Sequence, residues 1–93
     1  MKRRVRIWVS GRVQGVYFRA SARNTALALG LSGWVRNLAE GEVEILAEGK
    51  ETEIAAFIGW CGRGPLMARV DELKVVDEAP SGGFASFDVL RDG

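Results

Sequence analysis

The first informative feature of this 93-residue chain is the set of residues that it lacks or uses sparingly. It has no histidine, one cysteine (Cys61), two prolines, and only three side-chain amides (Gln14, Asn24 and Asn37). Without histidine there is no Ser-His or Cys-His nucleophile pair, no imidazole general base and no imidazole metal ligand. A single cysteine excludes an intramolecular disulfide and a zinc site built from cysteines. Any chemistry here therefore proceeds without the commonest general base at neutral pH.

Charge and hydropathy narrow the range of partners. Lys and Arg total 13 against 12 Asp and Glu, a net charge of +1, so no long-range field gathers nucleic acid. No run approaches the roughly 18 apolar residues of a membrane span. Arg6 and Arg12 interrupt the apolar run that a signal peptide needs. We expect no nucleic-acid or membrane partner and a cytoplasmic location, which one unpaired cysteine also suits.

The hydrophobic pattern predicts a single domain over residues 1–93 with the order βαββαβ plus a short terminal strand. Two helices on one face of a mostly antiparallel sheet make an α+β, ferredoxin-like split βαβ sandwich. A break in alternation between Val70 and Leu73 predicts a bulge, Gly30 is expected to end the first helix, and Cys61 falls at an apolar position of the second. Strands are expected near 5–9, 31–37, 42–48, 70–78 and 85–89, and helices over 17–29 and 51–61.

The segment Gly11–Arg19 joins the first strand to the first helix and carries the first candidate site. A glycine-bearing loop that leads into a helix directs backbone N–H groups into one concavity, where the helix dipole adds positive charge. Gly15 keeps that concavity clear of a side chain. Arg19 opposes the dipole by about 0.3–1 kcal/mol unless a bound anion pairs with its planar guanidinium. The alternatives are an ordinary strand–helix turn and a solvated Arg19 paired with a carboxylate.

Asn37 ends the second predicted strand. In a split βαβ sheet the start of the first helix can meet the end of a neighbouring strand, so Arg19 and Asn37 can lie at one edge. An asparagine there can accept a hydrogen bond from water through its carbonyl and donate one to a phosphoryl oxygen through its amide. We expect the side chain to be exposed, and a plain turn residue before a hairpin is the alternative.

Two other sets of residues suggest other functions. The acidic pairs Asp71-Glu72 and Asp77-Glu78 could begin a metal site, but such pairs at strand ends are usually solvated and no further ligands converge. Trp8, Trp34 and Trp60 would suit an RNA-binding ferredoxin-like domain, which stacks bases on sheet aromatics. The near-zero net charge and the absence of an aromatic RNA-binding motif disfavour that function.

Two blocks of the sequence resemble the two signatures of the acylphosphatase family. The first block is Gly11–Arg19 (GRVQGVYFR), and the second is Gly30–Asn37 (GLSGWVRN) followed by Gly41. Two ordered blocks at the family's spacing are more specific than either alone, and the likeness extends over nearly the whole chain. The chain departs from the pattern at Leu38, where many relatives carry threonine. A hydroxyl that could steady the asparagine or the water is therefore missing, which bears on rate more than on reaction type.

The resemblance implies a small, metal-independent hydrolase that needs no cofactor and splits an acyl phosphate into a carboxylate and inorganic phosphate. It implies that Arg19 binds the phosphoryl group and that Asn37 orients the attacking water. Phosphate or sulfate is then expected to compete with the substrate. A non-catalytic module that binds acyl phosphates or anions is the alternative. The residues expected to form the phosphate cradle are Gln14, Gly15, Val16, Tyr17, Phe18 and Arg19.

Overall fold

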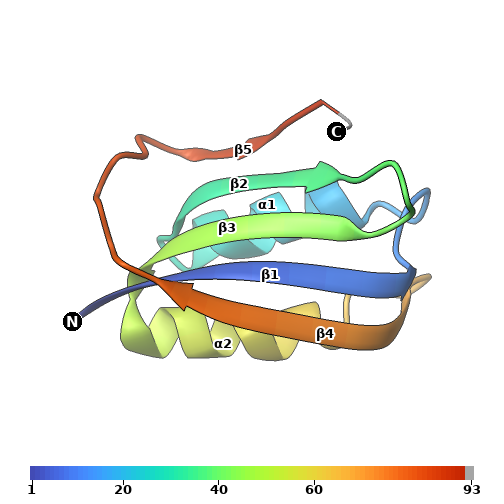
Figure 1. Cartoon of the computed structure of the whole chain (residues 1–93), viewed down its shortest axis with the longest axis horizontal. Helices are drawn as coiled ribbons and strands as arrows, with labels where there is room; N and C mark the ends of the chain where they lie inside the picture. The colour runs from blue at the N-terminus through green and yellow to red at the C-terminus, as the bar shows by residue number, and fades with distance from the viewer. Residues whose placement is uncertain (92–93) are drawn as a thin grey trace.

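The helices and strands occur in the predicted order. The computed structural model describes residues 1–91, in which five strands and two helices follow one another (Figure 1). The last two residues of the expected 1–93 domain lie outside the described residues. The elements are β1 (Lys2–Arg12), α1 (Phe18–Ala28), β2 (Ser32–Asn37), β3 (Val43–Lys50), α2 (Glu51–Cys61), β4 (Arg69–Glu78) and β5 (Phe87–Val89).

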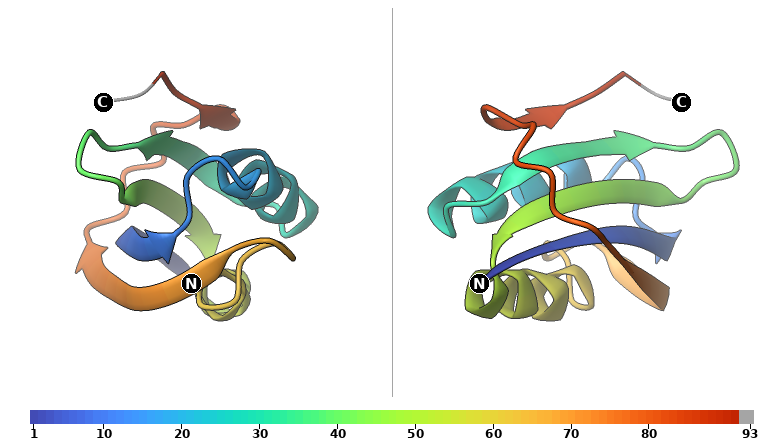
Figure 2. Two further views of the ribbon diagram at one scale, coloured as in Figure 1. Left: turned by 90° about the vertical axis from the view of Figure 1, so that its right-hand side faces the viewer. Right: turned by 60° about the vertical axis from the view of Figure 1, so that its left-hand side comes forward.

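The strands form one sheet in the order β4-β1-β3-β2-β5. Neighbouring strands pair antiparallel except β5, which runs parallel to β2. Among the described residues, both helices pack on one face of this sheet and leave the other face without a helix (Figure 2). The predicted α+β, ferredoxin-like split βαβ sandwich is confirmed. Neither of the helices in residues 1–91 has the length and apolar character needed to cross a bilayer.

The core lies between the helices and the sheet because each central strand buries alternate residues on that face. In β2 the alternation places Gly33, Val35 and Asn37 on the buried side. Cys61 at the end of α2 is fully buried, as predicted, and this burial raises the pKa of its thiol above the ordinary value. Other fully buried core residues are Val5, Ile7, Val9, Val43, Ile45, Ala47, Ile54 and Phe57.

Two predicted backbone irregularities are present. Gly30 has a φ of 72° just after α1, and the Leu31 N–H donates to the Ala26 carbonyl at 2.9 Å, so the helix ends in a Schellman motif. The pairing register between β1 and β4 shifts between Ser10 and Gly11, which pair with Glu72 and Val70. This shift is the predicted bulge.

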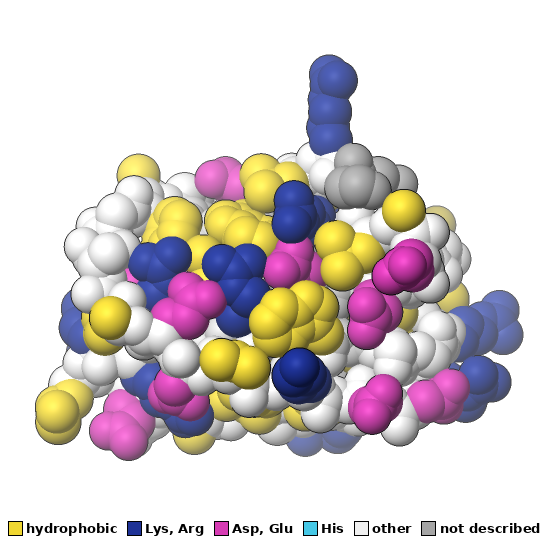
Figure 3. Space-filling view, viewed as in Figure 1, with side chains coloured by type: hydrophobic (Ala, Val, Ile, Leu, Met, Phe, Trp, Pro, Cys, Tyr) yellow, Lys and Arg dark blue, Asp and Glu magenta, His cyan; other side chains and the backbone are white. Residues whose placement is uncertain are grey.

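Ion pairs join four strands across the helix-free face of the sheet, where charged side chains of both signs lie next to one another (Figure 3). Arg6 Nε lies 2.7 Å from Glu78 Oε2, and Arg6 Nη1 lies 3.0 Å from Glu44 Oε2. Arg36 Nε donates to Glu44 Oε1 at 2.8 Å. The hydrogen bond from Arg6 lowers the pKa of the Glu78 carboxyl. These contacts tie β4, β1, β3 and β2 together on that face.

A buried carboxylate holds the connection that leads to β5. Glu48 on β3 is 3% exposed, and its two carboxylate oxygens accept hydrogen bonds from the backbone N–H groups of Ser81 at 3.1 Å and Gly82 at 2.7 Å. Arg4 lies 3.7 Å from the same carboxylate. This anchor fixes the path of the chain from β4 across the sheet to its last strand.

Gly33 is a position on β2 where a side chain cannot be accommodated. Its φ is 139°, and a Cβ atom there would collide with the Leu46 carbonyl oxygen of β3. We expect Gly33→Ala to lower the free energy of unfolding by about 2–4 kcal/mol, since it combines backbone strain with overpacking. Gly41→Ala is the matched control, because Gly41 has a φ of 103° and open space around it. Urea denaturation should show a smaller loss for Gly41→Ala, about 1–2 kcal/mol, and equal losses would contradict the collision.

Candidate active site

The loop before α1 presents its backbone to one side of the molecule. Gly15 and Tyr17 both have left-handed backbones, with φ values of 75° and 63°. The first helical hydrogen bond runs from the Ser21 N–H to the Tyr17 carbonyl at 3.0 Å, so the first-turn amides that precede it point out of the helix N-terminus. The N-cap residue Tyr17 makes no side-chain capping hydrogen bond at this end of the helix. Such an uncapped N-terminus favours an anion.

Tyr17 marks a strained point of this loop. A left-handed conformation costs a non-glycine residue about 1–2 kcal/mol, and the Tyr17 side chain is 82% exposed, so burial does not offset that cost. Strain of this kind persists where the surroundings impose it, and it clusters at functional sites. Here it lets the chain turn sharply from Val16, which is buried, into Phe18, which is also buried.

Arg19 lies in the first turn of α1, next to the end of β5. Its side chain is half-buried, and Nη1 lies 3.5 Å from the Leu90 carbonyl oxygen, a long contact. The guanidinium thus sits between a helix N-terminus and a strand that comes some 70 residues later in the chain. That Arg19 binds a phosphoryl group stays a prediction.

Asn37 does lie beside this loop, but the expectation that it is exposed was wrong. Its side chain is only 6% exposed, because it shares the helix-covered face with Val35 and because β5 continues the sheet beyond β2. Within residues 1–91, Asn37 Oδ1 is buried and has no hydrogen-bond partner. Buried polar atoms are nearly always paired, so an unpaired one calls for a specific explanation.

A hollow of about 440 Å³ brings these residues together. Figure 1 shows the blue start of α1 behind the arrowhead of β2, where the hollow lies. Five of the predicted site residues line it, whereas Gln14 and Val16 do not. Val13, Ala20 and Val89 line it without having been predicted. The full lining is Val13, Gly15, Tyr17, Phe18, Arg19, Ala20, Asn37 and Val89.

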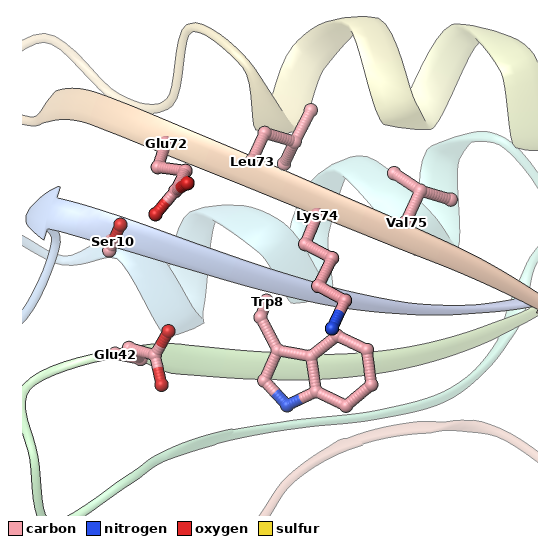
Figure 4. Close-up of a pocket in the computed structure, with 7 residues that line it drawn as sticks. All are labelled: Trp8, Ser10, Glu42, Glu72, Leu73, Lys74 and Val75. Carbon is pink, nitrogen blue, oxygen red and sulfur yellow. The ribbon is translucent and has the colours of Figure 1, made fainter.

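A second hollow, of about 580 Å³, lies on the helix-free face of the sheet (Figure 4). The Lys74 ammonium lies 5.5 Å from the centre of the Trp8 ring, and the Glu42 and Glu72 carboxylates also line this hollow. None of the predicted site residues lines it. Two carboxylates suit an anion poorly, so the hollow beside α1 is the better candidate.

Arginines bind the aspartate of each acidic pair on β4. Asp71 accepts hydrogen bonds from Arg69 at 2.9 and 3.2 Å, and Asp77 accepts them from Arg3 at 2.9 and 3.0 Å. These bonds lower the pKa of both carboxyls. In residues 1–91, no three His, Cys, Asp or Glu side chains gather closely enough to hold a metal ion.

Comparison with known proteins identifies the family. The sequence model of the acylphosphatase family matches residues 5–89. A curated acylphosphatase of Methylococcus capsulatus is 53% identical over 97% of this chain and 98% of its own length. The chain belongs to the acylphosphatase family. The crystal structure of acylphosphatase from Bacillus subtilis is 37% identical with a TM-score of 0.91, covering 97% of this chain and 99% of that chain.

One part of a longer solved protein shares this fold. Full-length HypF, solved in a phosphate- and nucleotide-bound form, is 31% identical with a TM-score of 0.87 over all of this chain and 13% of its own. The predicted acylphosphatase function is confirmed by the family match and by the curated and solved acylphosphatases, so the chain is a hydrolase that acts on acid anhydrides. The RNA-binding alternative is set aside.

Sequence reasoning missed one contact of the candidate site. The Gln14 side chain donates from Nε2 to the carbonyl oxygens of Leu38 at 2.8 Å and Glu42 at 2.9 Å. It therefore bonds to the turn that follows Asn37. The scarcity of amides had singled out Gln14, but no local pattern indicates a partner 24 residues away.

Proposed function

We propose that the chain hydrolyses an acyl phosphate by direct, in-line attack of water on a phosphoryl group held at the start of α1. The observation that supports this most is the shared hollow, which is lined by Arg19 in the first turn of α1, by Gly15 and Tyr17 in the loop before it, and by Asn37 at the end of β2. Phosphoryl transfer passes through a loose transition state with charge spread over equatorial oxygens. Fixed amides and one guanidinium can stabilise that charge without help from a metal ion or cofactor.

In this proposal Arg19 and the loop amides bind the phosphoryl oxygens. A guanidinium donates two parallel N–H bonds to a phosphate, and this planar grip fixes orientation as well as charge. The first-turn amides of α1 add donors whose dipole already favours negative charge. Gly15 leaves the approach open, because no atom lies within 4 Å of the place where a Cβ would be.

Asn37 is proposed to hold the attacking water. Its buried Oδ1 has no partner in residues 1–91, so it can accept a hydrogen bond from a water O–H. Such a bond aims the water oxygen at phosphorus. The leaving group is a carboxylate, which needs little protonation as the anhydride bond breaks, so no general acid is required. This explains how the reaction can proceed in a chain without histidine.

The substrate is proposed to be a small acyl phosphate, with phosphate and sulfate as competing ligands. HypF, of which 13% matches this chain, was solved in a phosphate-bound form, and we propose the same kind of ligand here. We propose a cytoplasmic location, which suits the unpaired Cys61. Neither nucleic acid nor membrane is proposed as a partner.

Inorganic phosphate should inhibit hydrolysis of benzoyl phosphate competitively, and sulfate should do the same, since both match the amide-lined helix N-terminus. Initial rates over a grid of substrate and inhibitor concentrations, with a chelator present, measure this. An apparent KM that rises with phosphate at constant kcat is the expected result. A kcat that falls at constant KM would place the phosphate site elsewhere.

Arg19→Lys should lower kcat/KM at least tenfold, about 1.4 kcal/mol of transition-state stabilisation, because lysine keeps the charge but loses the planar two-point grip. Arg23→Lys is the matched control, since Arg23 is exposed and does not line the hollow. Steady-state kinetics on both variants make the comparison. Turnover of Arg19→Lys equal to that of the control would reduce Arg19 to a surface ion-pairing residue.

Asn37→Ala should lower kcat by about 10²–10³-fold, the usual cost of losing one oriented polar group in a transition state, and leave phosphate affinity nearly unchanged. Turnover of benzoyl phosphate and phosphate binding by calorimetry are measured on the same preparation, with urea denaturation as the check of folding. Asn24→Ala, on the exposed surface of α1, is the control amide. A parallel loss of phosphate binding would show that Asn37 binds the anion and does not position water.

A further inference from the structure

The Gln14 amide links the two halves of the candidate site. Gln14 precedes Gly15 in the loop before α1, which we call the phosphate loop because it is proposed to bind the phosphoryl group. The Gln14 Nε2 donates hydrogen bonds to the Leu38 and Glu42 carbonyl oxygens at 2.8 and 2.9 Å. Leu38 follows Asn37 directly in the chain. The hydrogen bond from Gln14 to Leu38 therefore joins the sequence neighbour of Gly15 to the sequence neighbour of Asn37.

The turn after Asn37 does not need Gln14 to close. The Leu38 N–H donates to the Glu42 carbonyl at 2.8 Å, and the Gly41 N–H donates to the Leu38 carbonyl at 3.1 Å. Each carbonyl oxygen has two lone pairs, so the backbone satisfies one and the Gln14 amide takes the other. What Gln14 adds is therefore a connection between two loops that the backbone of the turn does not provide.

We propose that Gln14 is a positioning residue, which sets the distance and angle between the phosphate loop and Asn37. The inference rests on the proposed function, in which the loop holds the phosphoryl group and Asn37 holds water. In-line attack requires these two to be aligned, and a misplacement of about 1 Å can cost roughly 10²-fold in rate. Leu38 has no hydroxyl to steady Asn37, so Gln14 controls the position of Asn37 through the Leu38 backbone.

Gln14→Met tests this, because methionine has nearly the same length and no N–H donor. The expected result is a fall in kcat of about tenfold or more, with the inhibition constant of inorganic phosphate within about twofold of the unsubstituted enzyme, since the phosphate loop itself is unchanged. Gln14→Leu gives the same measurement if the methionine variant does not fold. A phosphate inhibition constant that rises as kcat falls would overturn the proposal and make Gln14 part of the anion site.

A double-substitution cycle separates positioning from a general structural effect. If Gln14 acts through Asn37, Gln14→Met should change kcat less than about twofold in the Asn37→Ala background. If the fold-changes in kcat caused by the two substitutions multiply in the double variant, the proposal is overturned. If Gln14→Met leaves kcat unchanged while Asn37→Ala strongly lowers it, the proposed role of Gln14 is overturned and that of Asn37 stands. Full turnover in Asn37→Ala would instead refute the proposed role of Asn37, and the role of Gln14 with it.

Discussion

Burial of the Phe18 ring fixes the end of α1 at which the phosphate is proposed to bind. Phe18 is the first residue of the helix and is 1% exposed. Its ring centre lies 5.3 Å from that of Trp60, which stacks in turn on Phe57 at 6.0 Å. Gly64 also lies against the ring, because an added Cβ there would come within 2.8 Å of it. Because the ring is held in this way, the Tyr17 turn before it stays in its costly left-handed conformation.

The candidate site shows how an enzyme can work with very few reactive side chains. Among the side chains that line the hollow, Arg19 is the cation and Asn37 is the amide. The remaining donors are backbone N–H groups at a helix end, whose positions come from the fold itself. These few donors are sufficient for an acyl phosphate, because its carboxylate is a good leaving group. Alignment and electrostatic stabilisation can then supply most of the rate enhancement. The ion pairs that Arg6 and Arg36 make with Glu44 and Glu78 lie on the opposite face of the sheet and join the strands there.

The elements, the fold and the two halves of the site could be predicted from sequence because their signals are local. Alternation places Val35 in the core, and the same alternation indicates that Asn37 is buried, although its place at a strand end suggested exposure. The hydrogen bond from Gln14 to Leu38 and the place of Val89 in the lining of the hollow could not be predicted. Both depend on partners that only the folded sheet brings near. A parallel pairing between β2 and β5 leaves no mark in either strand's own sequence.

The position of β5 in chain order affects how the site forms during synthesis. The loop before α1 and Asn37 are made early, and β2 can pair with β3 as soon as residue 50 is available. Val89 and the Leu90 carbonyl beside Arg19 come after every other element. A nascent chain that stops before residue 87 therefore carries the proposed catalytic side chains but lacks Val89 and Leu90, which lie beside them in the folded protein. The central strands can thus pair before the pocket is complete, and the pocket is completed only when β5 has been made.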